Sequence, residues 1–559
     1  MKNIELHGGK KHKKQYSRKH KRTMKQKYKK STEGYTCEKG KTLDECELEM
    51  LREAVDKAEE QLGKKMIMTP EIQQIVKIVE DFLKVKKLIC YGGTAINNLL
   101  PISDQFYRKD IELPDYDFYS MDAVKHAKEL ADIYYKLGFE EVEAKAGQHY
   151  GTYKVYVNFI PIADITQLAP EIYKNIRKEA IRVAGIYYAP PNFLRMGMYL
   201  ELSRPAGDVS RWEKVLKRLM LLNKNYPLKG KNCESIKVQR SLDNPKLLAK
   251  QEVIYNTVRE SFVDQGVIFF GGYANSLYMN YIPRNQDNKK TPDFDVLSED
   301  PETTTLIVKE RLMDEGLKHV SIRKHEEIGE LVTKHYEINV DGETVAFVYE
   351  PLACHSYNTI TIDGKMINVA TIDTMLSFFI AFYYSNRPYY NKNRILCMAQ
   401  QLFIILQKNR LRQKGLLKRF TIECYGNQPT IEDIRSLKAQ KYEELKTNLK
   451  SDEYTRWFLK YTPKDGKGKK SKKKKTQKNK SKMLTKTVSI QGSKIGETIA
   501  VDKSALPKTL KESYGFTPKS TKKNVKTVRF TPKAEKKRGN KTRKVRRKRE
   551  KRGFLGISF

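Results

Sequence analysis

The chain has 559 residues and a formal net charge of +41, a length that fits two folded domains with accessory segments. Residues 1–31 carry 13 Lys or Arg and one Glu, and residues 461–559 carry 34 Lys or Arg and six acids, which leaves about +1 for residues 32–460. The two ends have too few apolar residues to offset the entropy of folding, so we expect a near-neutral folded part between two disordered basic tails. Such tails either solubilise or localise a protein, or contact a polyanion by neutralising its phosphates.

The cysteines and the apolar runs exclude several classes of protein. The seven cysteines are scattered without a CxxC pair, so the sequence predicts neither a zinc site nor a disulfide framework and favours a reducing compartment. The basic N-terminus lacks the apolar run of a secretory signal. The longest apolar run, residues 375–384, is about half a membrane span, so we expect a soluble intracellular protein that does not enter a membrane.

The chain repeats one order of predicted elements. The first copy is expected to contain a helix over 71–87, a strand over 88–91, a helix after Gly92-Gly93, a strand over 115–120, a helix over 122–138 and extended segments over 140–146 and 152–166. The second copy is expected to contain a helix over 246–266, a strand over 267–270, a helix after Gly271-Gly272, a strand over 293–298, a helix over 302–317 and strands over 318–324, 335–340 and 343–354. Further predicted helices cover 210–223, 371–384 and 394–406, of which the last two are apolar on most sides, as buried helices are. We therefore predict an α/β (α+β) fold with two tandem mixed-sheet domains, produced by duplication, and helical appendages.

Each copy has a glycine pair between a strand and a helix. The pair lets the backbone turn sharply and approach a ligand closely. The new helix offers free N–H groups and the positive end of its dipole, which suits a phosphate. In the first copy Thr94 adds a hydroxyl that could meet a phosphate oxygen. Most glycine pairs are simply turns, so this motif alone does not establish a site.

Three acids of the first copy suggest a metal site. Asp115 and Asp117 stand two residues apart on a strand, so both carboxylates point to the same face and repel one another unless a cation lies between them. Mg²⁺ prefers carboxylates together with substrate phosphates, and paired metals serve phosphoryl transfer. Asp164 lies in the apolar run FIPIADIT, where an unpartnered carboxylate is costly to bury. Asp164 could share the metal face on an adjacent strand and deprotonate an attacking hydroxyl. The alternatives are that Asp115 and Asp117 are solvated in a loop, and that Asp164 caps a turn.

The motifs GGTAINNLL, DYDF and ADI, in this order, resemble the nucleotidyltransferase superfamily that includes DNA polymerase beta and the poly(A) polymerases. The run YLELSRPAGDVSRWEKVLKRLMLLN and the second copy are similar to the poly(A) polymerase catalytic subunits of poxviruses and giant DNA viruses. The resemblance covers residues 36–460 approximately. It implies transfer of AMP from ATP to the 3′-hydroxyl of RNA, with two Mg²⁺ or Mn²⁺ ions and release of pyrophosphate.

The resemblance also implies a role for each matching residue. Asp115 and Asp117 would hold the nucleotide-bound metal, and Asp117 with Asp164 would hold the metal that activates the 3′-oxygen. The expected triphosphate-binding residues are Gly92, Gly93 and Thr94, with Arg204, Arg211 and Lys214 beside the matching run as candidate cations. Each of these cations could equally be a solvated residue of a helix surface, and no residue identifies itself as the one that reads adenine.

The second copy keeps the glycine pair and the acids Asp293 and Asp295 but differs at two places. Tyr273 stands where the first copy has Thr94, and aligning VYEPLACH with FIPIADI puts Cys354 where the first copy has its third acid. A protonated thiol does not replace a carboxylate on a hard dication. We therefore predict a structural and RNA-holding pseudo-copy, whose stretch YYSNRPYYNKNR suits stacking on single strands, while metal binding by its acid pair stays open.

The sequence as a whole predicts a basic tail over 1–35, a catalytic nucleotidyltransferase domain over 36–225, a degenerate copy over 226–460 and a basic tail over 461–559. The expected activity is template-independent polyadenylation of mRNA. Uridylyl addition, CCA addition and an inert RNA-binding scaffold are the alternatives. The expected partners are ATP, an RNA 3′ end, and either a second copy of the chain or a cap-modifying processivity factor. A viral origin would place the protein in the host cytoplasm or the virion.

Overall fold

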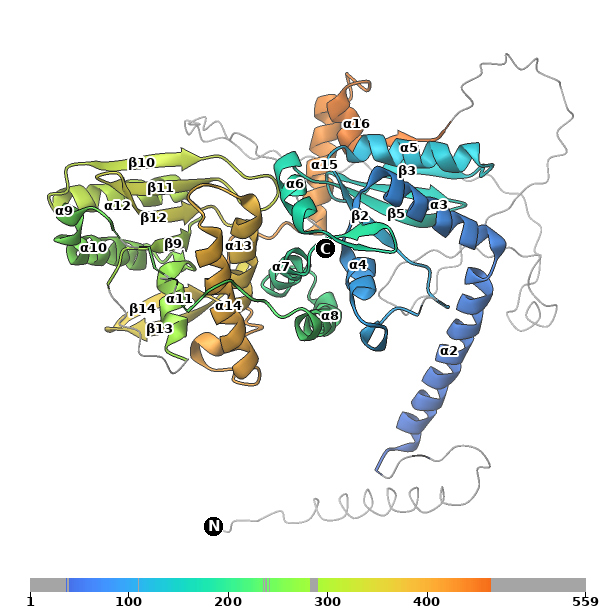
Figure 1. The fold of residues 1–559 in the computed structure, drawn as a ribbon, viewed down its shortest axis with the longest axis horizontal. Coiled ribbons are helices and arrows are strands. Elements are labelled where there is room, and N and C mark those ends of the chain that lie inside the picture. The colour runs from blue at the N-terminus through green and yellow to red at the C-terminus, as the bar shows by residue number, and fades with distance from the viewer. Residues whose placement is uncertain are drawn as a thin grey trace, which may run out of the picture. The chain divides into compact units, whose positions relative to one another are not determined.

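The structure is a computed structural model that describes Cys37 and residues 40–463, apart from 109, 235, 237–238, 241 and 282–289. The predicted basic tails, 1–35 and 461–559, lie outside the described residues except for 461–463. The two sheets that follow belong to one compact unit (Figure 1).

The first sheet has the strand order β16-β3-β4-β5-β2-β1-β7-β6. Its strands are β1 (Ile89–Cys90), β2 (Tyr116–Ser120), β3 (Val142–Ala146), β4 (Thr152–Val157), β5 (Ile160–Gln167), β6 (Ile181–Val183), β7 (Ile186–Tyr188) and β16 (Lys460–Tyr461). The helices of this part are α2 (Leu43–Ile67), α3 (Pro70–Lys86), α4 (Gly92–Leu99), α5 (Ala123–Lys136), α6 (Pro170–Glu179), α7 (Pro191–Leu202) and α8 (Trp212–Asn225). Helix α3 confirms the predicted amphipathic helix, since Pro70 suits its first turn and its buried residues share one face.

The second sheet has the strand order β10-β11-β12-β9-β8-β14-β13-β15. Its strands are β8 (Ile268–Phe269), β9 (Phe294–Leu297), β10 (Val320–His325), β11 (His335–Val340), β12 (Glu343–Tyr349), β13 (His355–Ile362), β14 (Lys365–Ala370) and β15 (Cys424–Tyr425). The helices are α9 (Pro245–Leu248), α10 (Gln251–Asp264), α11 (Gly272–Met279), α12 (Pro301–Asp314), α13 (Ile372–Ser385), α14 (Lys392–Lys408), α15 (Ile431–Leu445) and α16 (Asp452–Phe458). From β10 to β13 the spatial order repeats that from β3 to β6, strand for strand, which confirms the predicted pair of mixed-sheet units.

Strands β4 and β5 form a hairpin and not one extended segment. The chain turns at Asn158 and Phe159, which both adopt positive φ, and β4 then runs antiparallel to β5. Along β4 every second residue is buried, as expected of a strand with one covered face. The hairpin sets Lys154 opposite Asp164, which becomes part of the acidic face described for the site.

The last described elements return to the first sheet. Strand β16 pairs with β3, Tyr153 Oη donates to the carbonyl of Arg456 (2.9 Å), and Lys438 Nζ donates to the carbonyl of Gly147 (2.6 Å). The expectation of one continuous second domain over 226–460 is therefore wrong at its end, because α16 and β16 pack on the first copy. A two-residue strand has no periodicity from which its pairing could have been predicted.

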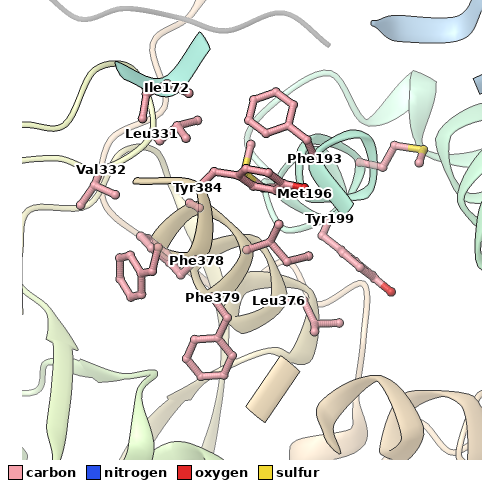
Figure 2. Close-up of a cluster of buried hydrophobic side chains, with 14 of the residues drawn as sticks. Ile172, Phe193, Met196, Tyr199, Leu331, Val332, Leu376, Phe378, Phe379 and Tyr384 are labelled. Atoms are coloured by element: carbon pink, nitrogen blue, oxygen red, sulfur yellow. The ribbon is translucent and has the colours of Figure 1, made fainter. Parts of the chain in front are cut away.

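Helices α7 and α13 pack against each other between the two copies and bury an apolar cluster (Figure 2). Phe193 of α7 meets Tyr384 of α13 edge to face, with 5.2 Å between the ring centroids. The predicted burial of the apolar helices is thus confirmed, and Tyr199 of α7 is fully buried as well. No helix in the described part of the chain combines the length and apolar character that a membrane span requires.

The aromatic-basic stretch that begins at Tyr383 also serves the contact between the copies. Tyr383 and Tyr384 donate hydrogen bonds to the carboxylate of Glu179 on α6 (2.6 and 2.9 Å). Arg387 forms a bidentate pair with Glu171 of the same helix (2.9 and 3.1 Å). These contacts join the two copies through partners about two hundred residues earlier, which a local pattern cannot show, and stacking of the stretch on single strands stays a prediction.

Six of the seven cysteines form disulfides, contrary to the expectation from their spacing. The pairs are Cys37–Cys46, Cys233–Cys397 and Cys354–Cys424, and Cys90 is buried and free. The second and third pairs bridge 164 and 70 residues, with Cα atoms 5.3 and 5.1 Å apart. Because sequence spacing does not reveal such long-range pairs, the inference of a reducing compartment loses its basis.

We expect Phe193→Ala to lower the free energy of unfolding by about 3–5 kcal/mol, because a fully buried ring leaves a cavity between α7 and α13. Urea denaturation followed by circular dichroism measures the loss. Phe159→Ala is the matched control: its ring is 80% exposed, and the change should stay within about 0.5 kcal/mol. Equal losses for the two variants would contradict the packing described.

Candidate active site

Helix α4 begins at the first glycine of the pair, directly after β1. Gly92 has a φ of 70°, which glycine adopts without strain. A Cβ at this position would collide with the carboxylate of Asp117, so the glycine also makes room for the acid. The N–H of Tyr91 donates to the carbonyl of Asp117 (2.9 Å), which fastens the turn to β2.

Strands β2 and β5 bring the three predicted acids together. The strands run parallel with Asp117 directly beside Asp164, and neighbours in register project to the same face of a sheet. Asp115 immediately precedes β2, two residues before Asp117, and so shares that face. The structure thus supplies an acidic face made by two adjacent strands.

Lys154 of β4 joins this acidic face from the third strand. It stands opposite Asp164 in the antiparallel register, and its ammonium group donates a hydrogen bond to the Asp164 carboxylate. Burial is the largest influence and works against the charge of the lysine, but the hydrogen bond to Asp164 and the nearby negative charges together raise the pKa of Lys154. The side chain of Lys154 is still 36% exposed, so another cation can displace it.

Burial and the crowding of the carboxylates raise the pKa of two of the acids. Burial is the first cause for both Asp115 and Asp117, and repulsion from the neighbouring acids adds to it. Lys154 opposes both shifts, Lys214 of α8 opposes that of Asp115, and Arg218 of α8 opposes that of Asp117. The pKa values stay raised despite these three cations, so the face favours further positive charge.

The donor set suits a hard dication, although the side chains have not converged on one point. No group of three or more His, Cys, Asp or Glu side chains in the described part of the chain lies closely enough to hold a metal ion in this structure. The acids nevertheless offer carboxylate oxygens, the ligands that Mg²⁺ and Mn²⁺ prefer, from the adjacent strands β2 and β5, with Lys154 on the next strand β4.

Not every predicted phosphate-binding residue faces the acids. Thr94 Oγ1 donates to the carbonyl of Asp115 (2.6 Å) and so ties α4 to the acidic strand. Arg211 forms an ion pair with Glu201 (3.0 Å). Burial raises the pKa of Glu201, and Arg211 and Arg204 counteract that shift, which places both arginines beside this acid. Of the three predicted cations, Lys214 is the one that acts on an acid of the candidate site.

Sequence reasoning missed Lys154 and Arg218. Arg218 follows Lys214 by four residues on α8, and its Nη2 donates to Tyr107 Oη (2.7 Å). A Cβ at Gly93 would meet both Tyr107 Oη and the Arg218 guanidinium, so these two groups lie against the start of α4. The four-residue spacing on α8 and the alternation of TYKVYV are the signals that could have indicated the two cations.

The second copy places its acid pair against buried arginines. Asp293 is fully buried and accepts hydrogen bonds from Arg240 N (3.0 Å), Arg240 Nε (2.6 Å) and Arg394 Nη1 (2.8 Å). Arg240 and Arg394 outweigh burial and lower the pKa of Asp293, whereas burial raises the pKa of Asp295 to about 6. Guanidinium groups therefore lie on the acids to which a metal would have to bind.

Phe347, and not Cys354, is the counterpart of the third acid. Strands β9 and β12 run parallel with Phe347 beside Asp295, the register that Asp164 has in the first copy. The alignment through Pro-x-Ala was wrong because Pro351 follows the end of β12, whereas its supposed equivalent lies inside β5. An aromatic ring thus replaces the third carboxylate.

Tyr273 occupies the position that Thr94 has in the first copy, as the sequence predicts, but its hydroxyl has a different hydrogen-bond partner. Its hydroxyl accepts a hydrogen bond from Arg259 Nε (3.1 Å), and its ring contacts that of Phe294. Tyr273 is buried, so the position has become part of an aromatic core.

Comparison with known proteins identifies the segment that contains the first site. Residues 77–208 match the family model of the poly(A) polymerase catalytic subunit. The family segment includes the glycine pair, the three acids and Lys154, and it ends just before α8.

Viral proteins are among the relatives of this segment. A protein of African swine fever virus assigned as a poly(A) polymerase catalytic subunit is 33% identical over 181 residues, which cover 31% of this chain and 38% of that protein. A protein of Acanthamoeba polyphaga mimivirus with the same assignment is 29% identical over 255 residues, which cover 43% of this chain and 41% of that protein. The matches thus span less than half the length of either relative.

The structural likeness extends beyond residues 77–208. The crystal structure of the Megavirus polyadenylate synthase matches with a TM-score of 0.63 at 21% identity, over 78% of this chain and 88% of that chain. At this identity the likeness concerns the fold, and it confirms an architecture of two mixed sheets.

We expect Lys154→Met to make the stability of the protein more responsive to divalent cations. Removing the ammonium leaves the repulsion among the acids unopposed, so the melting temperature without metal should fall. Added Mg²⁺ should then raise it by more than in the wild type, since about tenfold tighter binding is worth about 1.4 kcal/mol. Differential scanning calorimetry with and without Mg²⁺ measures both effects. Lys145→Met, on the neighbouring strand β3, is the control, and an identical response of the two variants would contradict the role given to Lys154.

Proposed function

We propose that the protein is a template-independent poly(A) polymerase that transfers AMP from ATP to the 3′-hydroxyl of RNA. The observation that carries the proposal is the register that sets Asp117 beside Asp164 inside the segment of the catalytic subunit family. Two carboxylates on one strand and a third on its neighbour are the acids that two-metal phosphoryl transfer requires. The assigned names of the viral relatives support the same activity.

The triphosphate would lie at the start of α4. The turn at Gly92 brings backbone N–H groups close to a bound phosphate, and the helix dipole favours the negative charge there. Lys214 and Arg218 of α8 supply the positive side chains, since both act on the acids of this face. Tyr107 holds the Arg218 guanidinium beside α4.

The three acids divide the chemistry of transfer among them. Asp115, Asp117 and Asp164 would hold Mg²⁺ or Mn²⁺, and two such ions would stabilise charge on the triphosphate and make the 3′-hydroxyl more acidic. Asp164 would accept the proton of that hydroxyl while the 3′-oxygen bonds to the α-phosphorus and pyrophosphate leaves. Lys154, released from Asp164, is then free to neutralise a phosphate of either substrate.

The basic segments 1–31 and 461–559 would contact RNA through its phosphates, with release of counterions. A second copy of the chain or a cap-modifying factor would supply processivity. Because the relatives are viral, the host cytoplasm and the virion are the proposed places of action.

Extension of a labelled oligo(A) RNA tests the proposed activity. We expect ATP alone among the four nucleotides to extend the primer, and Asp117→Asn to slow extension by about a thousandfold or more, since several kcal/mol of charge stabilisation are lost at about 1.4 kcal/mol per tenfold. Asp295→Asn, the equivalent change in the second copy, should keep most of the activity.

The outcomes of this assay separate the alternatives. Extension with UTP or CTP would indicate a different terminal nucleotidyltransferase. No incorporation of any nucleotide by the wild type would leave an RNA-binding scaffold. Equal losses for Asp117→Asn and Asp295→Asn would overturn the division of labour between the copies.

Substitution of the two α8 cations tests the triphosphate site. We expect Lys214→Ala and Arg218→Ala each to raise KM for ATP about tenfold, because each removes a charge-assisted contact worth about 1.5 kcal/mol. Lys217→Ala is the control on the same helix: its side chain is 72% exposed and pairs with Glu213. Steady-state kinetics at varied ATP should leave its KM unchanged, and a similar rise in all three variants would indicate a general effect on α8.

A further inference from the structure

The acid pair of the second copy carries an inference that goes beyond the proposed activity. We propose that Asp293 and Asp295 are a binding site for Arg240 of the same chain, and that this contact anchors the segment that links α8 to α10. The acids of the degenerate copy then hold the linker and not a metal ion.

The contact between Arg240 and the acids is buried and directional. The backbone N–H of Arg240 and its Nε donate to the two carboxylate oxygens of Asp293 (3.0 and 2.6 Å), and Arg240 Nη2 lies 3.8 Å from Asp295 Oδ1. The side chain of Asp293 has no exposed surface. Because an ionised carboxylate is costly to bury without a partner, the pair depends on these cations.

Phe347 completes the site for a guanidinium. The guanidinium carbon of Arg240 lies 5.0 Å from the centroid of the Phe347 ring. A carboxylate in this register, as Asp164 is in the first copy, attracts metal ions, whereas an aromatic face attracts a weakly hydrated planar cation. The replacement of the third acid therefore changes the preferred ligand from a dication to an arginine.

Further contacts fix the linker before it reaches Arg240. Tyr226, which follows α8 directly, donates through its hydroxyl to the carbonyl of Leu99 (2.8 Å). The N–H of Gly230 donates to Gln400 of α14 (2.5 Å), and Cys233 forms a disulfide with α14. Arg394, the second cation on Asp293, also belongs to α14. The linker, α14 and the acid pair therefore form one connected set of contacts.

The two copies differ in how readily a metal could replace the resident cation. In the first copy the cation is Lys154, whose side chain is 36% exposed. In the second copy Arg240 and Arg394 have side chains that are 20% and 12% exposed, and both contact Asp293. A dication would have to displace two partly buried guanidinium groups and release the linker, so the acid pair keeps its arginines.

A double-mutant cycle tests the anchor. We expect Arg240→Met and Asp293→Asn each to lower the melting temperature by about 5 °C or more, as removal of one partner from a buried ion pair does. Because the two residues are partners, the melting temperature of the double variant should be no lower than that of the less stable single variant. Arg311→Met is the control, since it removes an exposed arginine from an Asp264 pair in the same copy and should change the melting temperature by less than about 1 °C. Additive losses in the double variant would overturn the proposal.

Bound Mn²⁺, counted by electron paramagnetic resonance, separates the anchor from a second metal site. We expect the full-length wild type and the Asp293→Asn, Asp295→Asn double variant to bind the same number of ions, and the Asp115→Asn, Asp117→Asn double variant to lose them. Loss of bound Mn²⁺ on changing Asp293 and Asp295 would overturn the proposal. Both readouts are independent of adenylate transfer, so the anchor and the proposed activity can fail separately.

Discussion

Carboxylates that stand side by side on one face of a sheet repel one another, and each copy of this protein must bring positive charge to that face. The first copy does so with Lys154, Lys214 and Arg218, which approach from a strand and a helix and leave the pKa values of two acids raised. Burial is the first cause of this rise and repulsion among the acids adds to it, so further positive charge on this face would stabilise the ionised acids. The pairing of β2 with β5 holds the acids close together in spite of their repulsion.

The same sheet order in both copies shows that topology alone does not make an active site. The strand register is preserved, so that Asp117 beside Asp164 corresponds to Asp295 beside Phe347. Exchange of one carboxylate for a ring alters the balance of charge at that position. The guanidinium groups of Arg240 and Arg394 pair with Asp293, while burial still raises the pKa of Asp295. The divergence of the two copies is thus an electrostatic consequence of one substitution together with the linker arginine.

The two copies also depend on each other for burial. Helices α7 and α13 leave their apolar surfaces against one another, and α6 receives hydrogen bonds from Tyr383 and Tyr384 of α13. The chain then returns through α16 and β16 to the edge of the first sheet. The packing of the chain therefore crosses the boundary between the two sequence repeats: α13 packs on the first copy, and β16 joins its sheet.

The sequence by itself determined the duplication, most helices, the glycine turns and the three acids of the first copy, because these depend on local periodicity and on residue types whose chemistry is distinctive. It could not determine which residue of the second copy stands beside Asp295, since register depends on where β12 begins relative to β9. Long-range partners were likewise decided by the tertiary structure: Lys154 with Asp164 across a hairpin, Arg240 with Asp293, and the paired cysteines. Ion pairs and disulfides form between groups that folding brings together, and a single sequence carries no local signal of that proximity.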